Sequence, residues 1–444
     1  MEKQNNYQEV SPITQLAAWT NDYTANRNIP VEFPGELLSL TTADITPESC
    51  YHRRNLRNLP CFTIDSDDTN DMDDAVCLLK TESGYNLSVH IADVASYVTP
   101  GSELECCALQ RGTSIYLPHT TIPMLPPVLS DNLCSLNPHL DRKAISILID
   151  MDKDCNVLDY RLTKSTICSR VKGVYSEVDS ILDGCRNKKL TEKYSGLIEM
   201  LYDMRCVADK LREDRERNGA NISLNIATKF VVKNQRIERI ISEKGASHQI
   251  IEEFMVLANR LVAEYLRANR LPSILRTQKE VKKKASYLAL KECGHAELAL
   301  DRYAHFTSPI RRLADLKVHQ VLTAHLYGIE TEAIWTTFTR DLVESAKIAT
   351  RCENRWEDLE RDCNRKCATL FLTPKQNNEF CAEVVGFNYR NRAILMISKY
   401  RIQIIGHAGM RAALGQKVAV KLAVDIDNTS VEVISCQRIL HPVA

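Results

Sequence analysis

The sequence predicts an α+β protein: a large module with a mixed sheet wrapped by helices, followed by a small β-barrel. Residues 51–372 alternate between strand-like and helix-like patterns, which is the first observation. The second is a change to short strand-like runs after Pro374. The third is length, because 444 residues exceed one ordinary domain. We therefore expect an extension or linker at residues 1–50, the module at 51–372 and the barrel at 373–444.

The extension is polar and contains several prolines, with spacing for one short helix at residues 13–22. Within the module, two apolar and β-branched runs predict core strands at residues 87–94 and 144–149. Apolar residues at helical spacing predict three helices, at residues 197–211, 250–268 and 332–370. The last helix carries mixed charges, which are most simply explained as a solvated face.

The carboxyl-terminal region predicts a small OB-fold barrel. Five strand-like runs follow one another, at residues 380–387, 393–398, 400–406, 417–424 and 430–434. From Leu372 onward there are nine basic and five acidic residues, so this region is basic. Tyr400 and Arg401 place an aromatic ring beside a cation, as surfaces that bind single-stranded nucleic acid do.

Composition bears on the binding partners and the cellular compartment of the protein. The chain has 57 basic and 57 acidic residues, so nucleic-acid binding would need local basic surfaces. The sharpest basic cluster is Lys279, Lys282, Lys283 and Lys284, which either binds phosphates or belongs to a solvated loop or helix end. Sixteen cysteines without zinc-site spacing favour free thiols in a reducing space, so we expect a cytoplasmic protein. No apolar run reaches transmembrane length, so we expect no membrane partner.

An acidic segment follows the strand-like run at residues 59–64. It places six carboxylates within ten residues, at Asp65, Asp67, Asp68, Asp71, Asp73 and Asp74. Like charges this close raise one another's pKa values and oppose folding unless cations are held among them. Hard divalent cations prefer oxygen ligands, and pairs of such cations serve phosphoryl transfer. The segment therefore predicts a site for Mg²⁺, with Mn²⁺ as an alternative.

Two other interpretations of this segment compete with a metal site. A solvated acidic turn is the commonest reason for a short run of charges. A calcium-binding EF-hand loop needs Gly at its sixth position and Glu at its twelfth. Counted from Asp65, these positions hold Asn70 and Val76, so the EF-hand interpretation fails.

The order of the aspartates resembles a signature of the ribonuclease II family, whose catalytic module is the RNB domain. That signature is one Asp, five other residues, and then Asp-x-Asp-Asp; here it falls on Asp65, Asp71, Asp73 and Asp74. Three further blocks resemble family segments, at residues 116–136, 251–259 and 303–319. Four blocks in the same order are more specific than any single motif.

The resemblance implies roles for these residues. Asp65, Asp71 and Asp74 would ligate the metals, while Asp73 would ligate a metal or orient the attacking water. Arg311 would bind the scissile phosphate, because a planar guanidinium grips phosphate oxygens in a way that Lys cannot reproduce.

The resemblance also implies contacts to RNA. Tyr116 would stack on the terminal base. Glu252 or Glu253 would contact the terminal ribose, and the sequence leaves open which of the two does so. The family's opposing aromatic is missing after Gly219, where Leu224 could serve as an apolar substitute. The sequence also has no room for the family's usual amino-terminal cold-shock domains.

We expect a hydrolytic exoribonuclease that degrades single-stranded RNA from its 3′ end and releases nucleoside 5′-monophosphates. The direction follows from the resemblance alone. Two alternatives remain open: a non-catalytic RNA-binding or regulatory protein on the same scaffold, and a phosphodiesterase for short oligonucleotides. The sequence does not identify protein partners.

Overall fold

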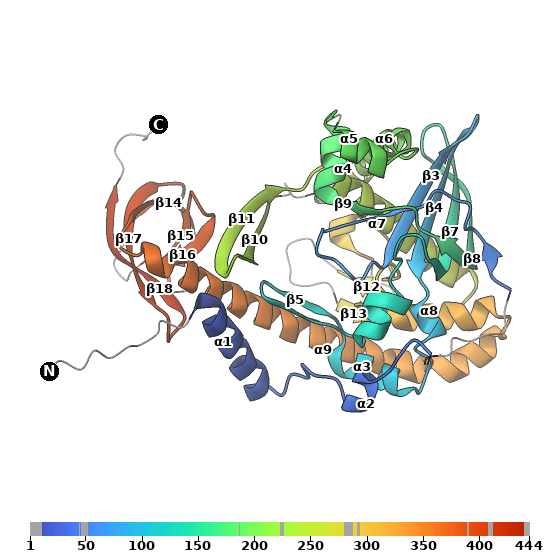
Figure 1. The fold of residues 1–444 in the computed structure, drawn as a ribbon, viewed down its shortest axis with the longest axis horizontal. Helices are drawn as coiled ribbons and strands as arrows, with labels where there is room; N and C mark the ends of the chain where they lie inside the picture. The colour runs from blue at the N-terminus through green and yellow to red at the C-terminus, as the bar shows by residue number, and fades with distance from the viewer. Residues whose placement is uncertain are drawn as a thin grey trace.

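The computed structural model describes residues 11–43, 45, 52–185, 187–222, 226–278, 287–290, 294–388, 390–406 and 412–438. A large α+β module lies at one end of the molecule and a barrel at the other (Figure 1). Across the described ranges, every helix is too short or too polar to cross a bilayer.

The module is built on a five-stranded mixed sheet in the order β1-β8-β7-β4-β3. All neighbouring strands are antiparallel except β1 and β8, which run parallel. The strands are β1 (Arg54–Asn55), β3 (Asp74–Lys80), β4 (Gly84–Ala92), β7 (Asp141–Asp152) and β8 (Val157–Cys168). The predicted strand at residues 144–149 thus lies within β7, while the one predicted at 87–94 overlaps β4 but extends two residues past its end.

Helices cover this sheet and close the main hydrophobic core. Helix α6 (Ile198–Arg217) packs against β3, α7 (Ala246–Ala268) against β4, and α8 (Leu313–Leu326) against β8. Consecutive residues of β4 from Ser88 to Ala92 are buried, which requires cover on both faces of the sheet. The predicted mixed sheet wrapped by helices is therefore confirmed.

One long helix, α9 (Thr331–Leu372), runs from the module to the barrel (Figure 1). Its 42 residues correspond to a length of roughly 60 Å. Helix α1 (Pro12–Asn26) packs along it, and the Tyr23 hydroxyl donates a hydrogen bond of 3.1 Å to Asp362. The amino-terminal helix is thus longer than the predicted 13–22, and residues 12–26 belong to the packed structure rather than to a free linker.

The carboxyl-terminal strands form a closed barrel in the order β14-β15-β16-β18-β17, which confirms the predicted five-stranded fold. Alternate residues of its first strand, Phe380, Ala382 and Val384, point into the barrel core. The strands are β14 (Glu379–Phe387), β15 (Ala393–Ile397), β16 (Ile402–Ile405), β17 (Lys417–Asp425) and β18 (Ser430–Arg438).

A hairpin of β10 (Ile226–Lys233) and β11 (Arg236–Glu243) stands between the module and the barrel (Figure 1). Arg239 donates hydrogen bonds of 3.2 Å to the carbonyl oxygens of Tyr400 and Arg401 in the barrel. This hairpin was not predicted from the sequence, and it gives the barrel a second connection to the module beside α9.

Shorter elements complete the fold. The helices are α2 (Gly35–Leu38), α3 (Glu103–Arg111), α4 (Tyr175–Leu182) and α5 (Lys188–Lys193). The strands are β2 (Thr63–Asp65), β5 (Ile115–Leu117), β6 (Thr120–Ile122), β9 (Lys172–Val174), β12 (Leu275–Thr277) and β13 (Tyr287–Ala289). Strand β2 pairs in parallel with β9, and β5 pairs with β6.

Candidate active site

Strands β2 and β3 hold the acidic segment between them. Asp65 ends β2 and Asp74 begins β3, while Phe62 and Val76 form a bridge that draws the two strands together. Between them, Met72 is buried, and its backbone N–H donates a hydrogen bond of 3.1 Å to the Ser135 hydroxyl. Met72 thus anchors the segment in the core between Asp71 and Asp73, which both line the cavity described next.

The four aspartates of the predicted signature line one cavity of about 200 Å³. The complete lining consists of Asp65, Ser66, Thr69, Asp71, Asp73, Asp74, Tyr116, Tyr175 and Arg311. The structure therefore brings together the predicted carboxylates, the predicted phosphate-binding arginine and the predicted stacking tyrosine. Asp67 and Asp68 do not line this cavity; both are exposed and lie on the rim of the adjoining groove.

The carboxylates of the cavity disfavour one another's charged forms. Burial, and then the charge of Asp73, raises the pKa of Asp65 to about 7. Burial, and then the charge of Asp65, raises the pKa of Asp74 to about 7. Burial also raises the pKa of Asp73 well above its ordinary value, although the charge of Arg311 opposes this shift. The cavity is thus a place where added positive charge would stabilise the protein.

Two of the four carboxylates are engaged by protein donors. Asp73 accepts hydrogen bonds from the backbone N–H of Ile310 at 2.8 Å and from Nε of Arg311 at 3.1 Å. Asp71 accepts a hydrogen bond from the hydroxyl of Tyr116.

In this conformation, no three acidic, histidine or cysteine side chains of the described residues form a group that could hold a metal ion. The four carboxylates nevertheless supply an all-oxygen donor set with raised pKa values, which suits a hard divalent cation. The carboxylates therefore fit a divalent cation in the chemistry of their oxygen atoms and in lining the same cavity. Binding an ion would require Asp71 and Asp73 to exchange part of their present hydrogen bonds for it.

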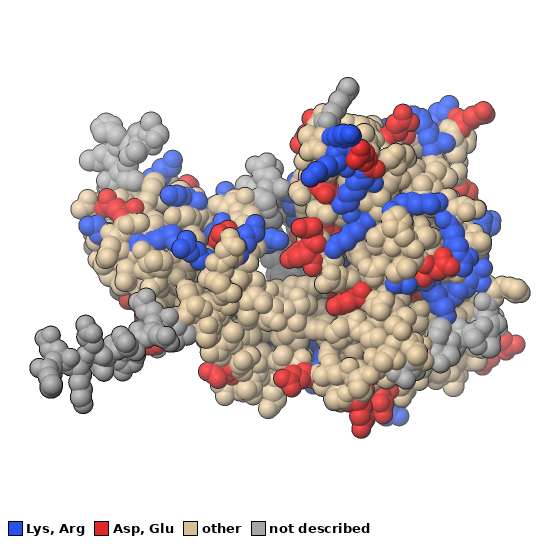
Figure 2. Space-filling model, viewed as in Figure 1, with Lys and Arg blue, Asp and Glu red and all other residues tan. Residues whose placement is uncertain are grey.

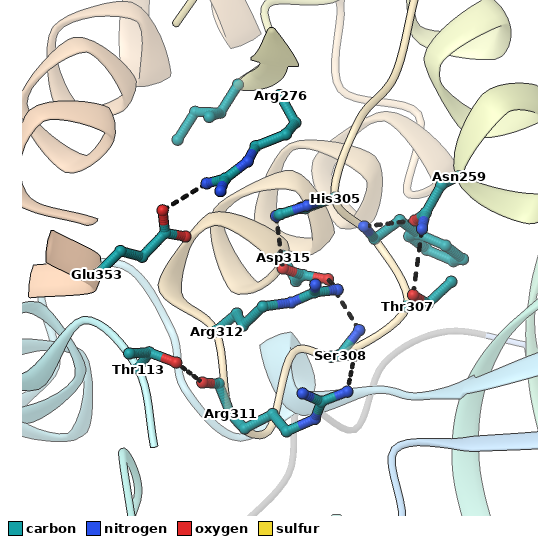
Figure 3. Close-up of polar contacts among 12 residues, drawn as sticks. Thr113, Asn259, Arg276, His305, Thr307, Ser308, Arg311, Arg312, Asp315 and Glu353 are labelled. Carbon is teal, nitrogen blue, oxygen red and sulfur yellow. Dashed lines mark hydrogen bonds and ion pairs between the residues drawn. The ribbon is translucent and has the colours of Figure 1, made fainter. Parts of the chain in front are cut away.

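Arg311 lies in the loop before α8, and hydrogen bonds hold both its backbone and its side chain (Figure 3). Its carbonyl oxygen accepts hydrogen bonds from the Ser114 N–H at 2.9 Å and from the Thr113 hydroxyl at 2.8 Å. Its guanidinium reaches Asp73, as above, and donates a hydrogen bond of 2.8 Å to the Ser308 hydroxyl. The neighbouring Arg312 does not line the cavity, and its guanidinium donates a hydrogen bond of 2.7 Å to Asp315.

The two histidines near this loop are buried outside the cavity. Burial, reinforced by Arg312, lowers the pKa of His305 well below its ordinary value. Burial lowers the pKa of His319 to about 4. The His319 ring stacks on Phe306 at 4.6 Å, and its Nε2 lies 2.7 Å from the Phe306 carbonyl oxygen. Both histidines are therefore neutral packing residues at neutral pH.

Two tyrosines form the aromatic part of the site. Tyr116 on β5 is 46% exposed, so its ring faces open space beside the acidic cavity. Tyr175, the first residue of α4, was missed by the sequence analysis; its ring stacks on His248 with centroids 3.8 Å apart. The sequence feature that could have indicated Tyr175 as a site residue is the strand-like run Lys172–Val174 before it. This run forms β9, which pairs in parallel with β2 and so places Tyr175 at the cavity. Leu224, the proposed apolar substitute, lies outside the described residues.

A larger groove continues outward from the cavity. Its volume is about 820 Å³, and it shares Tyr116 and Tyr175 with the cavity. One wall comes from the β10–β11 hairpin, which contributes Lys229, Phe230 and Lys233. On the face drawn in Figure 2, basic and acidic side chains are interspersed over both the module and the barrel. This mixture agrees with the balanced composition of the chain.

The two adjacent glutamates have different surroundings. Glu253 is buried and forms a two-point ion pair with Arg215, with distances of 2.8 Å from Nε and 2.6 Å from a terminal nitrogen. Glu252 is partly exposed and lies 3.4 Å from the same guanidinium. Neither lines the acidic cavity. Glu253 is thus the more deeply buried and more fully paired of the two glutamates.

The remaining predicted RNA-binding residues lie elsewhere. Lys282 and Lys283, with the rest of their cluster, lie outside the described residues. The Tyr400 ring is half-buried and packs edge-on against Phe371 and Phe380, with centroids 5.0 and 6.2 Å away. The Tyr400 ring thus joins the barrel to the end of α9 while part of it stays exposed, and its role in RNA binding stays a prediction. Arg401 beside it is exposed.

Comparison with known proteins agrees with this geometry. The sequence profile of the RNB domain matches residues 53–288 and 281–328. Ribonuclease R of Chlamydia trachomatis is 32% identical over 420 residues, which cover 80% of this chain and 59% of that protein. This chain thus spans less than two thirds of the length of that relative.

Solved structures share the fold. RNase R of Mycoplasma genitalium, in its apo form and in complex with ribose-methylated single-stranded RNA, matches with a TM-score of 0.82 and 21% identity. The match covers 95% of this chain and 78% of that one. Yeast Ssd1, a pseudonuclease, matches with a TM-score of 0.66 and 18% identity, over 92% of this chain and 57% of that one.

The profile match spans more than half of the chain and includes the four aspartates and Arg311. The chain belongs to the RNB-domain family.

Proposed function

We propose that this protein is a divalent-metal-dependent hydrolytic exoribonuclease that degrades single-stranded RNA from its 3′ end. One observation carries the proposal: four carboxylates, an arginine and two tyrosines line one cavity that opens to a larger groove. The relatives named ribonuclease R support the choice of RNA as the substrate. The product would be a nucleoside 5′-monophosphate, with water cleaving the bond between phosphorus and the 3′ oxygen of the preceding nucleotide.

Each residue of the cavity has a role in this proposal. Arg311 presents its guanidinium beside the carboxylates, where it would bind oxygens of the scissile phosphate and stabilise the charge that develops there. Tyr116 would stack on the terminal base and hold its phosphate against Arg311. Asp73 already fixes Arg311 through Nε, so it would align the guanidinium with the phosphate.

Asp65, Asp71, Asp73 and Asp74 would hold the divalent cations. When bound, such cations activate water and neutralise charge on the phosphoryl group. The raised pKa values of Asp65 and Asp74 support this part of the proposal, because both carboxylates are placed where a cation would favour their charged forms. Mg²⁺ is the first candidate and Mn²⁺ the second.

The groove and the barrel would hold the rest of the RNA. The groove reaches from Tyr116 and Tyr175 to the hairpin, whose Lys229 and Lys233 can pair with phosphates. Beyond the hairpin lies the barrel, which carries the exposed Arg401. Glu252, as the more exposed glutamate, is the better candidate for a ribose contact.

The alternative is a non-catalytic RNA-binding protein, since the fold is shared with a pseudonuclease. A binding protein has no use for four carboxylates that destabilise one another in one cavity, and their presence favours catalysis. All cysteines among the described residues are free thiols, which supports a reducing compartment such as the cytoplasm.

A cleavage assay tests the proposal. Single-stranded RNA labelled at its 5′ end is incubated with the protein and Mg²⁺, with and without a chelator. The expected result is a ladder that shortens from the 3′ end, release of nucleoside 5′-monophosphates, and no cleavage with the chelator. Binding without cleavage under all metal conditions would favour the non-catalytic alternative. A parallel series of long and short RNAs separates the exoribonuclease from a phosphodiesterase that accepts only short oligonucleotides.

A further inference from the structure

We propose that Ser308 and Asp315 are positioning residues for Arg311: the Ser308 hydroxyl fixes the guanidinium, and Asp315 fixes Ser308. The inference rests on the proposed function, because it takes Arg311 to be the group that binds the scissile phosphate. It concerns two residues that lie outside the acidic cavity and so would not touch the substrate.

The first contact is made at the guanidinium itself. Arg311 uses two different nitrogens: Nε donates to Asp73 at 3.1 Å, and a terminal nitrogen donates to the Ser308 hydroxyl at 2.8 Å. Two hydrogen bonds at separate nitrogens of a planar group fix its plane, whereas one would leave it free to rotate. The Asp73 carboxylate would also serve bound cations. Ser308 is therefore the partner that keeps its contact with Arg311 whatever Asp73 binds.

The second contact holds Ser308 in place (Figure 3). Its backbone N–H donates a hydrogen bond of 2.8 Å to one carboxylate oxygen of Asp315, in the first turn of α8. The same oxygen accepts a hydrogen bond of 2.7 Å from Arg312. Asp315 is completely buried, so water cannot replace it as an acceptor.

The two contacts together make a rigid connection from α8 to the cavity. The N–H groups of Arg311 and Arg312 both donate to the Ser308 carbonyl oxygen, at 3.3 and 3.0 Å, so residues 308–312 form a tight turn. Asp315 ties one end of this turn to the helix. The loop that carries Arg311 is thus fixed by a buried charge, and the side chain by a buried hydroxyl.

The expected effect is on turnover. Without the Ser308 hydroxyl, Arg311 keeps its charge and its contact with Asp73 but loses its fixed plane. A small misplacement of a positioning group lowers turnover by about ten- to a hundredfold, because the geometry matters most in the transition state. The Michaelis constant should change by less than about twofold, since the charge that attracts RNA remains.

A double-mutant cycle tests the connection with the full-length protein. Turnover of single-stranded RNA with Mg²⁺ is measured for wild type, Ser308→Ala, Arg311→Lys and the double variant. If Ser308 acts through Arg311, adding Ser308→Ala to Arg311→Lys should lower turnover by less than about twofold. Independent, multiplying losses in the double variant would overturn the inference.

Matched variants complete the test. Ser345→Ala removes a buried hydroxyl on α9 whose side chain contacts Asp341 and not Arg311, and it should leave turnover unchanged. Asp315→Asn should lower turnover in the same direction as Ser308→Ala and should likewise add little to Arg311→Lys. If Ser308→Ala fails to fold, Ser308→Cys, which keeps the volume but accepts hydrogen bonds weakly, takes its place in the cycle.

A measurement that needs no cleavage separates this inference from the proposed function. The Nε–H signal of Arg311 in an NMR spectrum reports how fixed the guanidinium is. In Ser308→Ala this signal should show faster exchange and a lower order parameter than in wild type. An unchanged signal would overturn the inference. An altered signal in a protein that cleaves no RNA would leave the positioning contact intact and refute the proposed function alone.

Discussion

The replacement Asp73→Asn gives the sharpest test of the acidic cavity. Asp73 is 3% exposed and accepts hydrogen bonds from the Ile310 N–H and from Arg311. An Asn of the same shape can still accept from Ile310, but its amide group would face the guanidinium as a second donor. The variant therefore removes one negative charge and one charged hydrogen bond while leaving the packing in place.

The magnitude follows from these contacts. Loss of a hydrogen bond to a charged partner costs about 1.5–3 kcal/mol, which corresponds to roughly a ten- to 150-fold loss of turnover if it is felt in the transition state. The lost carboxylate would also weaken electrostatic stabilisation by bound cations, worth about another hundredfold or more. Together these effects predict a drop of at least about a thousandfold in turnover.

Binding and stability should change far less. Because Asp73 sits among like charges, removing its charge relieves repulsion and offsets the lost contact with Arg311. RNA affinity should stay within about tenfold, since the lost group is acidic and does not attract phosphates. The melting temperature should stay within about 4 °C of wild type.

The assay compares turnover, RNA affinity and thermal unfolding in Asp73→Asn and in Asp159→Asn. Asp159 on β8 is a matched control, because it is an exposed aspartate that lines neither the cavity nor the groove. Wild-type turnover in Asp73→Asn, or equal losses in both variants, would refute the assignment of the cavity as the catalytic centre.

Three further predictions concern other parts of the molecule. Arg311→Lys should lower turnover far more than RNA affinity, because a Lys cannot reproduce the forked contact; a raised Michaelis constant with unchanged turnover would contradict this. The second variant replaces four basic barrel residues by Gln: Lys399, Arg401, Lys417 and Lys421. It should bind long single-stranded RNA more weakly, and the slope of log K against log salt should fall by up to about 3. An unchanged slope would show that the barrel does not contact the RNA. Burial alone would raise the pKa of Asp93, but the charges of Lys164 and Arg53 hold this pKa below its ordinary range. The ionised carboxylate therefore stabilises the fold at any pH above the pKa of an unfolded Asp. This stabilisation is lost as the pH falls toward the lower pKa of the folded protein. Asp93→Asn should therefore destabilise the protein by about 3–5 kcal/mol at neutral pH in chemical denaturation, and the difference from wild type should shrink in acid.

The parts of the site that could be predicted are those encoded locally. The spacing of Asp65, Asp71, Asp73 and Asp74 is set within ten residues, and Arg311 lies in a family block, so both followed from the sequence. Their meeting in one cavity depends on pairings between distant segments. Tyr175 was missed for this reason: only the parallel pairing of β9 with β2 brings it there.

The β10–β11 hairpin escaped prediction because its turn lacks the usual residues. Asn234 and Gln235 both have positive φ angles, of 46° and 58°. Turns of this kind normally carry Asn-Gly, and Gln at the second position gives no such signal. The packing of Tyr400 could not be predicted for a different reason, because its partner Phe371 lies on α9 and no local sequence pattern indicates that contact.

Helix α9 sets the spacing between the barrel and the cavity in whole residues. Each residue of an α-helix adds about 1.5 Å and turns the chain by about 100°. A single inserted residue between Cys352 and Leu372 would therefore swing the barrel around the helix axis and separate Arg239 from the carbonyl oxygens of Tyr400 and Arg401. An insertion of seven residues, close to two turns, would restore the facing but carry the barrel roughly 10 Å away. Only a few lengths of α9 therefore keep the barrel in the right orientation and at the right distance, and the present length is one at which the hairpin of the module contacts the barrel.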